Sequence, residues 1–146
     1  MKRNVRIGLM AAALSFANMS YADFIFRTNN PNACESLAGQ WAGTGKAYNW
    51  LVGTCIYHGI GLISTLDSSG SFTVDSAADK DSGSFLCPNH AARQLTGNCI
   101  NGVITVKTEY GNLTGTISAN SGDAKGTLTI SPGVTAEVTT TFSRVG

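Results

Sequence analysis

Apolar and polar residues alternate with a period of two along most of this chain. In the clearest run, Val134, Ala136, Val138, Thr140 and Phe142 share one face, and Thr135, Glu137, Thr139 and Thr141 share the other. Segments near 104–110, 113–119 and 125–130 alternate in the same way. Such alternation is typical of strands with one buried and one solvated face, and no window after residue 38 has the spacing of an amphipathic helix. The pattern predicts an all-β fold.

Turn residues separate these strands at short intervals. The turn signals are DSSG at 67–70, Asn101-Gly102, Gly111-Asn112, NSGD at 120–123 and SPG at 131–133. Earlier strands are expected at the motif that begins with Gly39 and near 53–66, 71–76, 83–88 and 93–100. About eight strands at this spacing are typical of a barrel or a sandwich. An up-and-down antiparallel barrel leaves no exposed edge, so we predict that closure, with a two-sheet β-sandwich as the alternative.

The N-terminal residues have the composition of a secretory signal peptide. Basic residues at the start precede a short apolar stretch at 7–16 and a small-x-small motif that ends at Ala22. This apolar stretch is too short to span a bilayer, and we expect cleavage after Ala22 and export to the periplasm or the extracellular space. The predicted parts are a signal peptide over 1–22, an N-terminal arm over 23–37 and a barrel domain over 38–146.

The net charge of the chain argues against one class of partner. The full chain has ten Lys and Arg against nine Asp and Glu, a formal net charge of +1. Loss of the signal peptide removes three basic residues and no acidic ones, which leaves a net charge of −2. Nucleic-acid-binding domains carry a basic surplus, so we expect no nucleic-acid partner. We also expect no transmembrane segment and no cofactor.

Four cysteines, Cys34, Cys55, Cys87 and Cys99, follow the predicted signal peptide. An even number in an exported chain of this size predicts two disulfides, for which three pairings are formally open. Cys87 and Cys99 face the same side of two predicted strands that the loop at 88–92 joins. Cys55 faces outward, where a segment before the first strand can reach it. We therefore predict the pairs Cys34–Cys55 and Cys87–Cys99.

Residues at both ends of the predicted barrel resemble a family pattern. Gly39 and Trp41 form a Gly-x-Trp motif on the first strand, and Arg144 lies near the end of the last strand in TTFSRVG. This pair resembles the calycin superfamily, which includes lipocalins, avidins and bacterial metalloprotease inhibitors. The resemblance implies that Trp41 caps one end of the barrel and that Arg144 packs across its ring. Such a contact is worth about 0.5–2 kcal/mol.

The chain also departs from that superfamily. It lacks the long first loop and the helix of lipocalins, and Trp50 is the only other tryptophan where avidins have a set that contacts biotin. Gly43 and Gly45 continue the face of Trp41, and glycines there bend a strand or leave a cavity inside the barrel. We favour bending, because glycine kinks commonly curve barrel strands.

Two histidines are candidates for ligand contact. His58 shares a face with Ile56, Ile60, Leu62 and Leu66, whereas Cys55 and Tyr57 face the other way. An inward histidine either contacts a ligand in the barrel or is a hydrogen-bonded core residue. The candidate ligand-binding residues are accordingly His58, Tyr57 and Tyr110. His90 is expected to be solvated, and a zinc site on Cys87 and His90 would lack a second ligand pair, so we expect no metal.

The chain offers little for catalysis. Asp75, Asp79 and Asp81 lie in DSAADKDSG, which has the composition of a calcium loop but not the spacing or closing Glu of an EF-hand. A flexible solvated loop is the preferred interpretation of this segment. The serines lack a G-x-S-x-G elbow, and most carboxylates fall in turns or on outward faces. We expect no enzymatic activity and no catalytic residue.

Three classes of function fit these features. The preferred class is an exported binding protein, because an eight-stranded barrel is just wide enough to be filled by side chains or to hold one small ligand. The second is an inhibitor of a protease or other hydrolase, with Phe24, Ile25 and Phe26 of the arm as apolar anchors, unless this trio pairs as an extra strand. The third is a surface or adhesion protein, suggested by threonine-rich outward faces. The partner is thus an unidentified small ligand or a protein such as a hydrolase, and the oligomeric state stays open.

Overall fold

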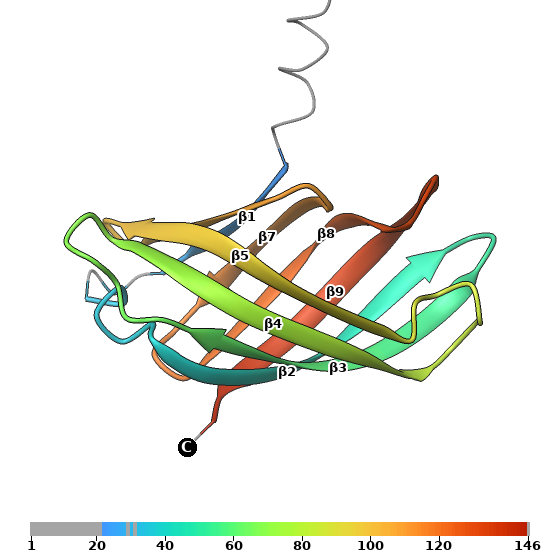
Figure 1. Ribbon diagram of the computed structural model, residues 1–146, viewed down its shortest axis with the longest axis horizontal. Helices are drawn as coiled ribbons and strands as arrows, with labels where there is room; N and C mark the ends of the chain where they lie inside the picture. The colour runs from blue at the N-terminus through green and yellow to red at the C-terminus, as the bar shows by residue number, and fades with distance from the viewer. Residues whose placement is uncertain (1–21, 29, 31, 146) are drawn as a thin grey trace, which may run out of the picture.

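The alternating segments fold as strands that close into one barrel. The computed structural model describes residues 22–28, 30 and 32–145, which form nine strands. The strands are β1 (Ala22–Arg27), β2 (Gly39–Asn49), β3 (Gly53–Ile63), β4 (Ser71–Ser82), β5 (His90–Ile100), β6 (Val103–Thr108), β7 (Gly111–Ile117), β8 (Ser121–Ser131) and β9 (Val134–Arg144). In Figure 1, β3, β4 and β5 cross in front of β7, β8 and β9. The predicted all-β barrel is confirmed, and the sandwich alternative is not adopted. In the described part of the chain, no helix is long and apolar enough to cross a membrane.

The topology is an antiparallel meander with one inserted strand. Strands β2 to β9 pair in sequence order except between β6 and β7, and β2 closes the barrel by pairing with β9. β1 lies between β6 and β7, antiparallel to β6 and parallel to β7. The expected antiparallel meander is therefore present except between β6 and β7, where β1 is inserted and makes the barrel a mixed sheet of nine strands.

The sequence of β1 explains its place in the wall. Phe24 and Phe26 pack against the core cluster of buried residues, whereas Ile25 lines the outer surface. The Phe26 ring meets that of Phe142 edge-on, with centroids 5.6 Å apart. β1 also pairs backbone groups of β6 and β7 that would otherwise form open edges. The segment predicted as an N-terminal arm therefore begins as an extra wall strand, and Phe24, Ile25 and Phe26 do not project from the barrel.

Three of the five predicted turn signals lie in turns or connections, whereas Gly111-Asn112 and residues 121–123 lie within β7 and β8, because the chain turns just before each of these signals. Asn101 and Gly102 have φ angles of 53° and 78°, the left-handed conformation of a two-residue hairpin turn. The β8–β9 turn falls at the predicted SPG, and the β3–β4 connection contains the predicted DSSG.

Strand β4 is longer than its sequence pattern predicts. It continues to Ser82 through the segment expected to be a flexible loop, and residues 83–88, expected to be a strand, form a loop instead. Pairing with β3 and β5 on both sides holds this polar segment extended. Asp75, Asp79 and Asp81 therefore alternate along the outer face of a strand, and the calcium-loop alternative is wrong.

The inward face of β3 is opposite to the predicted one. Cys55 is fully buried, whereas Ile60 and Leu62 are each 54% exposed, and His58 shares their outer face. Inward positions of β3 include Gly59, where a Cβ would lie 2.9 Å from a backbone oxygen of β4. The inward side of β3 therefore lies close to β4. The aliphatic residues of this strand face solvent and do not identify its core-facing side.

Two disulfides are present, as predicted, but the predicted pairing is wrong. The bonds join Cys34 to Cys99 and Cys55 to Cys87, with Cα–Cα distances of 5.6 and 6.6 Å. Cys87 lies in the loop at 83–89, which folds over the barrel end and reaches the inward-facing Cys55. Cys34 follows β1 and lies beside the end of β5. The error follows from the reversed face of β3 and from the loop that replaces the expected strand.

Trp41 closes one end of the barrel, which we call the Trp41 end. Its side chain is 5% exposed, and its indole N–H donates to the Leu37 carbonyl at 3.0 Å. The Arg144 guanidinium lies 4.6 Å from the centre of the indole ring and donates to the carbonyls of Ala38, at 2.8 Å, and Ser36. The Trp–Arg contact that the family resemblance implies is therefore present, and Arg144 ties the segment before β2 to the last strand.

The opposite end is covered by the loop at 83–89. The Tyr57 hydroxyl donates to the Pro88 carbonyl at 2.8 Å. The Lys80 ammonium donates to two carbonyl oxygens of the same loop at 2.7 and 3.1 Å. Together with the buried Cys55–Cys87 bond, these contacts fix the loop over the barrel mouth.

Inward glycines allow neighbouring strands to approach closely. A Cβ at Gly115 or Gly126 would lie 1.8 Å from a carbonyl oxygen of the adjacent strand, and one at Gly43 would lie 2.6 Å from another. These positions therefore have no room for a side chain. At Gly43 the glycine allows β2 to approach β9 closely and has no free space beside it, and the predicted bending of the strand stays a prediction.

Candidate functional site

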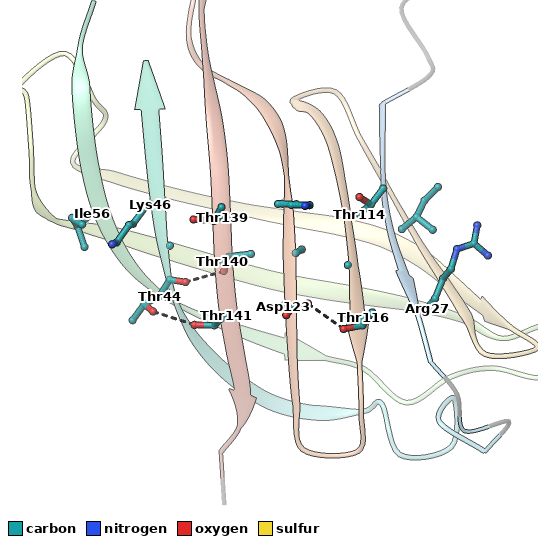
Figure 2. A pocket seen from close by; sticks show the side chains of 15 residues that line it. Arg27, Thr44, Lys46, Ile56, Thr114, Thr116, Asp123, Thr139, Thr140 and Thr141 are labelled. Carbon is teal, nitrogen blue, oxygen red and sulfur yellow. Dashed lines mark hydrogen bonds between the residues drawn. The ribbon is translucent and has the colours of Figure 1, made fainter. Parts of the chain in front are cut away.

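A groove crosses the outer wall of the barrel, and we call it the outer groove. It has a volume of about 880 Å³ and runs over β1, β7, β8, β9 and β2 to the start of β3. Its lining consists of Ile25, Arg27, Thr44, Gly45, Lys46, Ile56, Thr114, Gly115, Thr116, Asp123, Ala124, Lys125, Thr139, Thr140 and Thr141. Figure 2 shows Lys46 and Ile56 on one side, Arg27 on the other, and three threonines of β9 between them.

Backbone register arranges the outward side chains of the outer groove in two rows. The first row is Arg27, Thr116, Asp123, Thr141 and Thr44. The second row is Ile25, Thr114, Lys125, Thr139, Lys46 and Ile56. Neighbouring strands lie about 4.8 Å apart, so one extended ligand can touch several members of a row.

Hydroxyl groups dominate the middle of the outer groove. The Thr44 and Thr141 hydroxyls lie 3.5 Å apart, and the Thr116 hydroxyl donates to the Asp123 carboxylate at 3.1 Å. Each hydroxyl can both donate and accept, so this surface can pair with the hydroxyls or anionic oxygens of a ligand.

Three cations line the same groove without an ion-pair partner. In the part of the chain that the structure describes, no carboxylate oxygen lies within 4.0 Å of a charged nitrogen of Arg27, Lys46 or Lys125. The groove contains one carboxylate, Asp123. Its local charge is therefore positive, and these cations are available to an anion.

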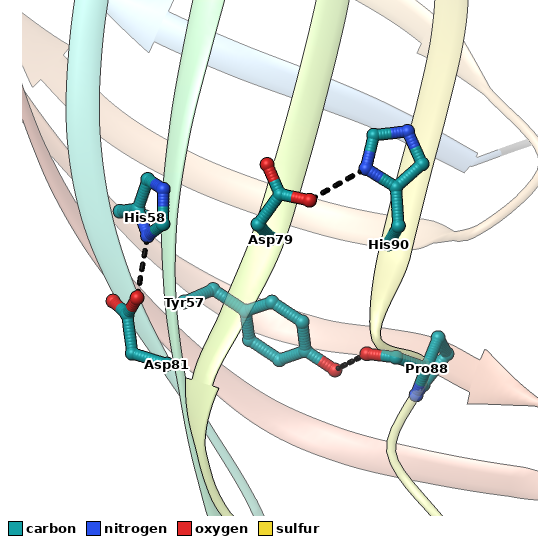
Figure 3. A network of polar contacts seen from close by, with 6 residues as sticks. All are labelled: Tyr57, His58, Asp79, Asp81, Pro88 and His90. Atoms are coloured by element: carbon teal, nitrogen blue, oxygen red, sulfur yellow. Dashed lines mark hydrogen bonds and ion pairs between the residues drawn. The ribbon is translucent and has the colours of Figure 1, made fainter.

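A second polar cluster lies on the outer face of β3, β4 and β5 (Figure 3). His58 Nδ1 lies 2.6 Å from the Asp81 carboxylate, and His90 Nδ1 lies 2.7 Å from that of Asp79. All four side chains are about half exposed. Within the described residues, no group of three such side chains is placed to hold a metal ion. Exposed pairs of this kind are worth at most about 1 kcal/mol, so the cluster is a solvated surface feature.

The three predicted ligand-binding residues lie apart. His58 faces outward, whereas Tyr57 faces inward under the loop at 83–89, where burial raises the pKa of its hydroxyl. Tyr110 lies at the β6–β7 turn, where its hydroxyl accepts a hydrogen bond from Arg93, whose guanidinium is 5.7 Å from the ring centre. The expectation of an inward His58 is wrong, and these residues do not form one site.

Exposed apolar side chains gather on loops at the barrel end opposite Trp41. Trp50 is 82% exposed, Leu51 66%, Phe85 90% and Leu86 47%. The β2–β3 turn and the loop at 83–89 that carry them lie together at the right of Figure 1. We call these four residues the apolar tip.

The loops of the apolar tip are anchored to the barrel. The Asn49 amide donates to the Thr135 carbonyl at 2.6 Å, and the Ser131 hydroxyl donates to the Leu86 carbonyl at 3.2 Å. The Cys55–Cys87 bond holds the base of the second loop. Contiguous apolar patches on protein surfaces often mark interaction sites, so the apolar tip is a candidate interaction surface.

Comparison with family models, curated proteins and solved structures found no match to this chain. The calycin-like resemblance therefore stays a prediction.

Sequence reasoning did not find the outer groove or the apolar tip. The alternation of β8 and β9 already places Lys125, Thr139 and Thr141 on the outer wall. Nothing local to the sequence shows that Arg27 lies on a strand beside β7. For the apolar tip, a signal was available: Trp50-Leu51 follows a strand that ends at Asn49, so both residues fall in a turn.

Proposed function

We propose that the protein is an exported, non-enzymatic binding protein that holds its ligand in the outer groove rather than inside the barrel. The observation that carries this proposal is the set of three unpaired cations in an open groove. Cations that have no internal partner retain their full interaction with an external anion.

The packing of the barrel supports an external site. Leu37 of the segment before β2 and Trp41 of β2 cover one end, and the loop at 83–89 covers the other. Phe24, Phe26 and the core cluster occupy the interior at the Trp41 end. A ligand inside the barrel would have to displace these side chains.

Export is supported by the two disulfides, which persist in oxidising compartments. The predicted signal peptide lies outside the described residues except for Ala22, the last residue of that segment. A non-enzymatic role is consistent with the exposed His–Asp pairs, in which each imidazole contacts one carboxylate.

Titration with palmitate tests the site of binding. We expect no saturable uptake, because a packed interior offers no room for an acyl chain. The matched control is the Trp50→Ser/Phe85→Ser variant, which removes apolar groups outside the barrel. Equimolar palmitate binding that survives in this variant would place a ligand inside the barrel and refute the proposal.

A second candidate function, inhibition of a hydrolase, is favoured by the apolar tip. Its side chains protrude from disulfide-anchored loops, and pre-organised loops lose little entropy on docking. Because β1 is part of the wall, these loops replace the N-terminal arm as the inhibitory segment in this candidate.

Assays against a panel of secreted metalloproteases and serine proteases test this candidate. We expect inhibition of at least one enzyme by the wild type, and loss of inhibition by at least tenfold in the Trp50→Ser/Phe85→Ser variant, since buried aromatic anchors each contribute about 1 kcal/mol or more. The midpoint of thermal unfolding should stay unchanged. Failure of the wild type to inhibit any enzyme of the panel counts against this candidate.

A further inference from the structure

We infer that the outer groove binds a linear acidic polysaccharide, one that carries carboxylate or sulfate groups along its length. This inference rests on the proposed function and specifies its ligand. It follows from the juxtaposition of three unpaired cations and a field of threonine hydroxyls along a groove that crosses several strands.

The cations are spaced across the groove rather than clustered. Arg27 is on β1, Lys125 on β8 and Lys46 on β2, with one strand, β7 or β9, between each pair. A step of two strands corresponds to about 10 Å across the sheet. Figure 2 shows Arg27 and Lys46 at opposite sides of the groove. This spacing fits a ligand whose charges recur along a chain and does not fit a single compact anion.

Charge is segregated between two faces of the barrel. The outer groove holds three of the seven Lys and Arg among the described residues and one carboxylate. The outer face of β4 carries Asp75, Asp79 and Asp81. A polyanion is therefore attracted to the groove and repelled from the β4 face, although the described chain carries more acidic than basic residues.

The threonine hydroxyls of the outer groove provide the second set of contacts with a polysaccharide. Thr44, Thr116 and Thr141 lie in the row of Arg27, and Thr114 and Thr139 lie in the row of the two lysines. Hydroxyls that both donate and accept can match the hydroxyls of sugar rings, while the cations form charge-assisted hydrogen bonds with carboxylates or sulfates.

The lining argues against a nucleic acid as the polyanion. None of the fifteen lining residues is aromatic. Single-stranded nucleic acids are bound by basic grooves that also contain aromatic side chains on which the bases stack. A polysaccharide requires no such platform when its charges supply the attraction.

Isothermal titration with dextran sulfate, polygalacturonate, neutral dextran and single-stranded DNA tests the inference on the intact protein. We expect binding of at least one of the two acidic polysaccharides, affinity that falls as salt rises because counterions are released, and no binding of neutral dextran. The Lys46→Gln/Lys125→Gln variant should bind the acidic polysaccharide about 25-fold more weakly at low salt, about fivefold for each charge. Lys107→Gln removes one charge from the exposed outer face of β6 and should remain within about twofold of the wild type, against about fivefold for each groove lysine.

Other results of these titrations would overturn either the acidic ligand or its position in the outer groove. Weakening of about fivefold in Lys107→Gln, the same as for each groove lysine, would show diffuse electrostatic attraction and overturn the inference, as would tighter binding of DNA or no binding of either acidic polymer. Binding of neutral dextran as tight as that of the acidic polymers would overturn the acidic ligand but leave an external site intact. The external position of the site is tested separately by the palmitate titration, in which binding inside the barrel would refute it.

Discussion

Opening both disulfides is expected to lower the free energy of unfolding by about 8 kcal/mol, about 4 kcal/mol for each bond. The bonds close long segments, with sequence separations of 65 and 32 residues, so each removes much conformational freedom from the unfolded chain. This loss is comparable with the whole stability of a typical domain, about 5–15 kcal/mol. Denaturant unfolding of Cys34→Ser/Cys99→Ser and Cys55→Ser/Cys87→Ser, singly and combined, measures it.

Peptide mapping without reduction is the control for these variants. It should yield a Cys34–Cys99 peptide and a Cys55–Cys87 peptide from the wild type. A stability unchanged by reductant, or a Cys87–Cys99 peptide, would contradict the arrangement of the loop at 83–89 over the barrel end.

Truncation of Trp41 to alanine is expected to cost about 3–5 kcal/mol of unfolding free energy. The change removes a buried ring, its hydrogen bond to Leu37 and its contact with the Arg144 guanidinium, so the Trp41 end loses its cover. Trp50 offers a matched control because its side chain is 82% exposed. Trp50→Ala should change stability by no more than about 0.5 kcal/mol.

Chemical unfolding followed by circular dichroism compares the two tryptophan variants without using tryptophan fluorescence. Similar losses of unfolding free energy in both variants, or a loss below about 1 kcal/mol for Trp41→Ala, would mean that Trp41 is not part of the core.

The strands from β6 onward could be predicted from sequence because their alternation is regular, although the signals at Gly111-Asn112 and 120–123 placed two turns slightly too late in the chain. The Asn101-Gly102 turn adopts the left-handed geometry that this dipeptide favours. The Trp41–Arg144 contact could also be predicted from sequence, because both residues occupy inward positions at matching ends of β2 and β9.

Strand β3 shows where local pattern fails. Its aliphatic residues Ile60 and Leu62 face solvent, and its inward face includes Gly59 and the disulfide-bonded Cys55. A strand that packs tightly against its neighbours uses small residues on the inside, so hydrophobicity alone assigns the wrong face. The disulfide pairing depended on that face and failed with it.

The outer groove is formed by strands that lie far apart in the sequence. Sequence alternation identifies outward residues on β2, β8 and β9, but the groove also needs Arg27 of β1, which enters between β6 and β7. A parallel contact between β1 and β7 joins residues about 90 positions apart, such as Phe24 and Leu113, and no turn signal links them. The pattern of charge could therefore be recognised only once the strand order was known.

Methyl chemical-shift mapping during titration with dextran sulfate distinguishes a ligand on the outer wall of the barrel from one inside it or at the apolar tip. We expect progressive shifts at the methyl groups of Thr44, Thr139 and Thr141 in the outer groove. Methyl groups of the buried Ile104 and Leu113 should remain unchanged. Shifts centred on Ile104 and Leu113, or on Leu51 at the apolar tip, with none in the groove, would refute binding on the outer wall.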